Sequence, residues 1–418
     1  MLRIHHWKQH CRISFYCFVL IFLFLPNFWV IEPQVASPLG FDQNSKNYDT
    51  TRTNSDPFSA ILRHAHSYLR FDKNRAYTYL ADQVHLGYRI PGTPESIECQ
   101  NYIVDQLSNV SESVYFHNFN FKGTDCTNII VKMNKGAGDI LIFAAHYDTR
   151  AIAENDDDVS KQDSPILGAN DGASGVAVVM EMLQTLYLNR SKIPYEIWGI
   201  FFDAEDQGDG GKPGWDWIEG SKALAQDLEN PNHFLFTTGQ SLESIEAFIL
   251  FDMVGGTNLQ FIHEGHSDQQ LLSSIFQTGQ QLGYKDQFPD SGRTYSVIDD
   301  HLPFVNRGVK AVNLIINFWA NPGWPYHHTT LDNLDNIDIN SLEITGRTVE
   351  MFVYLNYMDA FGGIPDDWPP PATSGPPTRV ILISAVGLGV VSLFLLIKIK
   401  KRTRSEVALD EKNRGPKA

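Results

Sequence analysis

Residues 139–146 read DILIFAAH, an almost unbroken apolar run that stops at a histidine. Three later stretches have the same form, namely 195–203 (YEIWGIFFD), 246–252 (EAFILFD) and 310–317 (KAVNLIIN). Short runs rich in β-branched and aromatic residues are typical of strands that are covered on both faces. We therefore predict four buried strands, three of which end at ionisable side chains.

Stretches with the helical spacing of apolar residues alternate with these strands. The alternation predicts an α/β fold of three layers, in which a central, mostly parallel twisted sheet has helices on both faces. In such sheets ligands bind outside the carboxyl ends of the strands, so we expect the active site there. The predicted helices span 74–85, 95–108, 172–188, 267–283 and 338–359.

These elements define one folded catalytic domain, predicted to span 57–362. Two segments of different composition flank it. Residues 33–56 are polar and lack apolar spacing, and residues 363–379 contain six prolines. We expect the first segment to be a linker and the second to be an extended stalk.

Both ends of the chain carry long apolar segments. Residues 13–31 follow a basic cluster, and we expect 1–32 to be an N-terminal signal-anchor. Residues 380–397 are free of charge and long enough for a transmembrane helix, and the basic tail 398–418 follows them. Because basic flanks stay in the cytosol, we expect a membrane protein whose tail is cytosolic and whose catalytic domain faces outside.

The composition limits the classes of function. The chain has 418 residues, with 33 Lys and Arg against 49 Asp and Glu and a formal net charge of -16. Phosphate contacts do not hold so acidic a chain on nucleic acid. Only Cys99 and Cys126 of its four cysteines lie outside the N-terminal segment, so these two can form one disulfide or remain free thiols.

Ionisable residues follow the first predicted strand and precede the next helix. His146 and Asp148 stand two apart at the strand end, where they point the same way and either bind a metal or form an ordinary polar cluster. Asp171 lies in GANDGASG, whose small residues let the next helix approach the sheet closely. Its carboxylate either caps that helix or faces a cation.

Carboxylates also end the next two strands. Glu205 and Asp206 leave the strand in different directions, so one can bind a metal while the other acts as a base, although strand-end acids are often only solvated. Asp252 has apolar neighbours on both sides, and a charge there needs a partner.

The last third of the chain adds Asp299, His301 and the pair His327 and His328. Taken singly, such histidines are more often surface or core groups than ligands. Taken together with the strand-end carboxylates, two histidines give the nitrogen and oxygen ligand set of a catalytic zinc site.

Six segments carry a family resemblance, in the order HYDTR, GANDGASGVAVVMEM, FFDAEDQG, FDMVG, DDHLPF and HHTTLDNLDNID. As a set they resemble the zinc aminopeptidases and their relatives, the glutaminyl-peptide cyclotransferases, over roughly residues 75–360. The resemblance implies that Asp171, Asp206 and His328 are metal ligands and that Glu205 is the general base.

The resemblance gives two residues different roles in the two subfamilies. His146 corresponds to a ligand of one zinc in the two-metal aminopeptidases, with Asp148 behind it. Asp252 corresponds to a ligand of the other metal in the peptidases, or to a proton-relay acid in the cyclases. In the cyclase pattern Asp299 belongs to the same proton network.

The resemblance also implies a substrate pocket with an aromatic wall, for which Trp215 and Trp217 are the candidates. We expect His301 and His327 near the substrate as well. Two positions depart from the cyclase pattern, because His327 stands where a Trp usually precedes the last ligand and Asn313 replaces a His of animal cyclases.

The expected activity is that of a membrane-anchored zinc enzyme that acts on the N-terminus of a peptide or protein. The cyclase reading has one zinc and converts N-terminal Gln to pyroglutamate with release of ammonia. The alternative is a two-zinc aminopeptidase, a hydrolase in which zinc-activated water attacks the first peptide bond. A third class, receptor-like ectodomains without metal, is disfavoured because every ligand position is filled.

Overall fold

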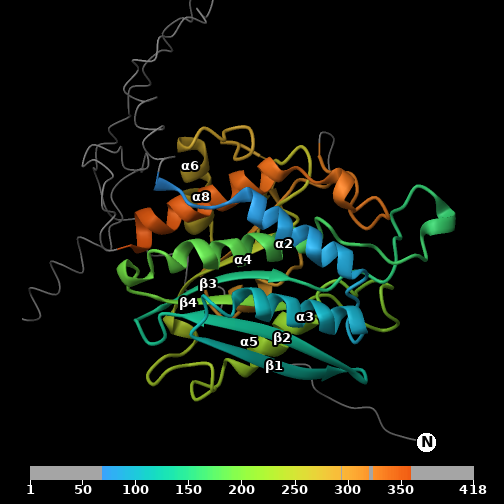
Figure 1. Ribbon diagram of the computed structural model, residues 1–418. Helices are drawn as coiled ribbons and strands as arrows, with labels where there is room; N and C mark the ends of the chain where they lie inside the picture. Colours follow the sequence, from blue (N-terminus) through green and yellow to red (C-terminus); the bar gives the residue numbers. More distant parts are fainter. Residues whose placement is uncertain (1–67, 293, 320–322, 359–418) are drawn as a thin grey trace, which may run out of the picture. The chain divides into compact units, whose positions relative to one another are not determined.

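A computed structural model describes residues 68–292, 294–319 and 323–358, which form a central sheet with helices on both faces (Figure 1). The predicted α/β architecture is confirmed. The predicted signal-anchor, linker, stalk, transmembrane helix and basic tail lie outside the described residues. Within the described ranges, no helix is long and apolar enough to cross a membrane.

The sheet has the strand order β1-β2-β4-β3-β5-β8. Strands β4, β3, β5 and β8 run parallel and are the four strands predicted from sequence, whereas β1 and β2 add an antiparallel edge. The sheet strands span Ser113–Phe121 (β1), Thr124–Met133 (β2), Ile140–His146 (β3), Glu196–Phe202 (β4), Ile245–Asp252 (β5) and Ala311–Ile315 (β8), and a separate pair joins His263–Glu264 (β6) to Thr294–Tyr295 (β7).

Helices pack on the two faces of this sheet in unequal numbers (Figure 1). One face carries α2 (Lys73–Leu86), α3 (Pro94–Leu107), α4 (Ala173–Tyr187), α6 (Gln269–Gln281) and α8 (Ile339–Tyr357), and these match the five predicted helices. The other face carries α5 (Glu219–Asp227) and the short α7 (Leu302–Val305), which the sequence analysis did not predict. Cys99 and Cys126 are both buried, free thiols.

Helix α4 lies closest to the site and is buried along nearly its whole length. A Cβ atom on Gly175 would lie 2.1 Å from the carbonyl oxygen of Phe251, so only glycine lets α4 approach the end of β5. This close approach holds the preceding turn, which contains Asp171, at the carboxyl edge of the sheet.

A buried carboxylate joins the last helix to the first described segment. Glu350 on α8 accepts hydrogen bonds from the backbone N–H groups of Arg70 (2.7 Å) and Phe71 (2.9 Å). Burial raises the pKa of Glu350 to about 7, although the two N–H groups oppose the shift.

This raised pKa predicts a pH dependence of stability. In the unfolded chain Glu350 ionises near its ordinary pKa of 4.5, so between that value and about pH 7 the folded state binds more protons. The free energy of unfolding therefore falls as the pH rises through this window, by up to about 3 kcal/mol. We expect Glu350→Gln to lose this part of the dependence, measured by urea unfolding at pH 5 and pH 8. An unchanged difference between the two pH values would contradict the assignment.

Candidate active site

The carboxyl ends of the parallel strands surround a cavity of about 370 Å³. Predicted residues from five separate segments line it together, because the loops that follow parallel strands meet at the same edge of the sheet. The lining includes Asp171, Glu205, Asp206, Trp217, Asp252, Asp299, His327 and His328.

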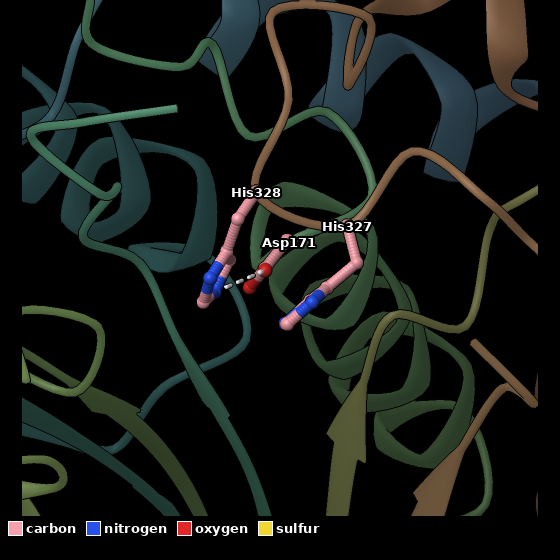
Figure 2. Close-up of side chains that lie close together, drawn as sticks. All are labelled: Asp171, His327 and His328. Atoms are coloured by element: carbon pink, nitrogen blue, oxygen red, sulfur yellow. Dashed lines mark ion pairs between the residues drawn. The ribbon is translucent and has the colours of Figure 1, made fainter. Parts of the chain in front are cut away.

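Three of the predicted ligands meet at one imidazole nitrogen. Nε2 of His328 lies 3.2 Å from Oδ1 of Asp206 and 3.8 Å from Oδ2 of Asp171. Figure 2 shows His328 and Asp171 turned toward one another. The turn with Asp171 is fixed by Asp332, whose carboxylate accepts the backbone N–H groups of Asn170 (2.7 Å) and Asp171 (3.1 Å).

His327 is a further candidate ligand, which the sequence analysis placed near the substrate instead. Ligand atoms of Asp171, His327 and His328 lie within 4.8 Å of one another, and the two imidazoles stack with ring centres 3.6 Å apart (Figure 2). Burial, with the charge of His328, lowers the pKa of His327 to about 3, so its ring is neutral at physiological pH. It can therefore offer a nitrogen lone pair to a cation or a substrate.

His146 lies among the acids at the end of β3. Its Nε2 is 3.1 Å from Asp171 and 3.3 Å from Oδ1 of Asp252, and ligand atoms of these three residues lie within 4.8 Å of one another. Burial alone would lower the pKa of His146, but the surrounding carboxylates raise it well above its ordinary value. Asp148 accepts the backbone N–H groups of Glu205 (3.0 Å) and Asp206 (3.2 Å), and so orients the loop after β4.

Glu205, Asp252 and Asp299 form a second group of acids in the cavity lining. Burial raises the pKa of Glu205 and of Asp299 well above their ordinary values. Burial also raises the pKa of Asp252, and the carboxylate of Asp299 accepts a hydrogen bond from Nδ2 of Asn313 at 2.6 Å.

The site contains more buried negative charge than its own cations balance. Burial raises the pKa of Asp206, and its Oδ2 atom is buried without a hydrogen-bond partner. Carboxylate oxygens and imidazole nitrogens are ligands that zinc accepts, and a bound cation would reverse these pKa shifts. Asp171, Asp206 and His328 therefore fit a zinc ion.

Two of the predicted substrate contacts are not among the described residues that line the cavity. Trp215 packs edge-on against Phe121 at 5.0 Å in a small apolar cluster, and the Nε2 atom of His301 lies 3.0 Å from buried Glu264. Both side chains therefore contact other residues of the protein interior instead of lining the cavity. Trp217 does line the cavity, and its ring stacks on His328 with centres 5.8 Å apart.

The mouth of the cavity is apolar and was not predicted. Ile298 and Trp319 are 57% and 48% exposed, and Val297 and Phe318 lie beside them in the lining. These residues lie in loops without apolar spacing, so periodicity gave no signal for them.

The comparisons with known proteins agree with this fold. The model of Peptidase family M28 matches residues 128–353. A glutaminyl-peptide cyclotransferase of Boiga irregularis is 28% identical, over 64% of this chain and 78% of its own. A glutaminyl cyclase of Bacteroides thetaiotaomicron is 33% identical with a TM-score of 0.60, covering 68% of this chain and 98% of its own. A Zn-dependent exopeptidase of Parabacteroides distasonis is 30% identical with a TM-score of 0.59, covering 68% and 98%.

The excess of buried carboxylates predicts that zinc stabilises the folded chain. At a zinc concentration a hundred times the dissociation constant, we expect the free energy of unfolding to rise by about 2.7 kcal/mol. Asp171→Asn should need at least about tenfold more zinc for the same effect. Asp105→Asn, an equal charge change at an exposed position of α3, should respond to zinc like the natural chain. Thermal unfolding during a zinc titration measures this, and an equal response of Asp171→Asn and the natural chain would contradict it.

Proposed function

The chain belongs to Peptidase family M28, and from that premise we propose that it is a zinc enzyme that cyclises N-terminal glutamine of peptides or proteins to pyroglutamate. Enzymes of this family related to the chain include glutaminyl cyclases and zinc-dependent exopeptidases. The choice between these two activities depends on whether the buried acids Asp252 and Asp299 keep their protons.

The burial of Glu205, Asp252 and Asp299 around one cavity, which raises the pKa of all three, is the observation that carries the cyclase proposal. Acids with raised pKa values keep their protons more readily than exposed acids do. A carboxyl group that keeps its proton is a poor ligand for a second metal but a suitable member of a proton network. We therefore propose one zinc, held by Asp171, Asp206 and His328.

When bound, zinc would act as a Lewis acid that polarises the side-chain amide of the substrate. Glu205 lies at the same cavity and takes a proton from the α-amine as the amine nitrogen bonds to the amide carbon. The same carboxyl group then gives that proton to the departing nitrogen, and the carbon–nitrogen bond breaks to release ammonia. No water is consumed, so the apolar residues at the mouth favour cyclisation over hydrolysis by excluding water.

The alternative is a zinc aminopeptidase with two metal ions. The group of His146, Asp171 and Asp252 supports it, because their ligand atoms lie close enough to hold one ion. In that case Asp252 has lost its proton, and Glu205 activates water for attack on the first peptide bond.

We also propose that the catalytic domain faces outside the cell on a membrane. The support for this proposal is the sequence pattern alone, namely the apolar segments 13–31 and 380–397 and the basic tail 398–418.

Product analysis separates the two activities. We expect the full chain with zinc to release ammonia and a pyroglutamyl product from a peptide with N-terminal Gln, and to leave a peptide with N-terminal Leu intact. Mass spectrometry of both peptides and an ammonia assay measure the outcome. Release of free Leu would instead establish the aminopeptidase, and the absence of both products would contradict the proposed function altogether.

Removing the base should abolish turnover without loss of metal. We expect Glu205→Gln to lower kcat by about 10²- to 10⁴-fold, because Gln cannot accept the proton, while its zinc affinity stays close to that of the natural chain. Glu243→Gln, the same change at an exposed site, serves as the control. Turnover of Glu205→Gln within about tenfold of the control would exclude Glu205 as the base.

A further inference from the structure

The loop that carries His328 is held by a second loop that follows β3. His328 has a left-handed backbone, with φ of 56°, which is uncommon for a residue other than glycine. Its carbonyl oxygen accepts the backbone N–H of Asn155 at 3.1 Å. Two residues later, the backbone N–H and the hydroxyl of Thr330 both donate to Asp156, at 3.0 Å and 2.5 Å. The loop around residue 155 therefore fixes the backbone of the proposed ligand.

Glu154, in the same loop, contacts the imidazole of this ligand directly. Its Oε1 atom lies 2.7 Å from Nδ1 of His328, and its Oε2 atom accepts Nε of Arg150 at 2.7 Å. The carboxylate thus bridges the imidazole and a guanidinium group.

Arg150 extends this bridge to a second proposed ligand. Its side chain is fully buried, and its Nη1 atom donates to the backbone oxygen of Asp206 at 3.2 Å and lies 3.5 Å from Oδ1 of the same residue. The guanidinium also lies over the ring of Trp217, 4.7 Å from its centre, and that ring stacks on His328. Glu154 and Trp217 therefore both contact the His328 side chain, and Arg150 joins them to Asp206.

A carboxylate beside a guanidinium is ionised and can only accept hydrogen bonds. Nδ1 of His328 must then carry the proton that it donates to Glu154, so Nε2 is the nitrogen that can bind a metal once its own proton is displaced. That nitrogen faces Asp171 and Asp206. The bridge thus settles which nitrogen is available to a metal.

We infer that Glu154 is a positioning residue that selects the metal-binding tautomer of His328 and fixes its ring orientation. The inference rests on the proposed zinc site. Carboxylates that accept the free N–H of a metal-bound histidine raise its basicity, and their loss typically weakens metal affinity by about 10- to 100-fold. The Glu154 side chain is 34% exposed, so Glu154 is not part of the packed core.

Two substitutions in one loop test this role on the full chain. Glu154→Gln removes the charge while keeping the shape, and Asp157→Asn makes the same charge change at an exposed residue three positions along. Zinc dissociation constants are measured by competition with a chromophoric chelator. We expect about 10- to 100-fold weaker zinc binding in Glu154→Gln and a change of less than about twofold in Asp157→Asn. Equal affinities of the two variants would overturn the inference.

Cobalt provides a readout that depends on ligand geometry and needs no turnover. We expect the visible absorption bands of the Co²⁺-loaded chain to shift in Glu154→Gln and to stay unchanged in Asp157→Asn. Unshifted bands in Glu154→Gln would show that Glu154 does not orient the ligand.

The natural chain supplies the remaining test, which holds even if Glu154→Gln fails to fold. Histidine ¹⁵N NMR of the zinc-loaded chain should show the proton of His328 on Nδ1, with the signal identified by its loss in His328→Gln. A proton on Nε2 would overturn the inference. Failure of the natural chain to bind zinc would instead remove the proposed function, whereas tight binding with an unaffected Glu154→Gln would remove only the role of Glu154.

Discussion

Burial of several carboxyl groups at the carboxyl edge of a parallel sheet is the constraint on which the site depends. Asp171, Glu205, Asp206, Asp252 and Asp299 all line one cavity, and ionised groups this close repel one another in a region of low dielectric constant. Protonation relieves part of the repulsion, in line with the raised pKa values of Glu205, Asp252 and Asp299. A bound cation relieves the rest, which is why the site fits a zinc ion beside a proton network.

The fold meets this constraint by fixing the backbone of three of these acids through hydrogen bonds. Asp332 fixes the turn with Asp171, and Asp148 fixes the loop with Glu205 and Asp206. Glycine at position 175 lets α4 approach β5. These contacts determine the positions of the ligands before any metal binds, so binding requires little rearrangement.

The sequence predicted the parallel strands, the five long helices and the residues at the strand ends, because buried strands leave unbroken apolar runs and amphipathic helices leave periodic ones. Strands β1 and β2 were not predicted. The edge strand Ser113–Phe121 is half-buried and carries polar residues, and the interior strand Thr124–Met133 combines polar residues with only a short apolar run. Glu154 was missed for another reason. Its contact with His328 joins residues 174 positions apart, and such a pairing depends on tertiary structure that periodicity does not encode. The same holds for Trp215, whose packing against Phe121 follows from the position of β1.

The central claim is that one zinc binds between Asp171, Asp206 and His328, with His146 and Asp252 left to the proton network. Anomalous X-ray diffraction from zinc-loaded crystals, recorded above and below the zinc absorption edge, locates the metal without reference to activity. The account predicts one anomalous peak bounded by Asp171, Asp206 and His328. A second peak beside His146 and Asp252, or a single peak elsewhere in the chain, would contradict it.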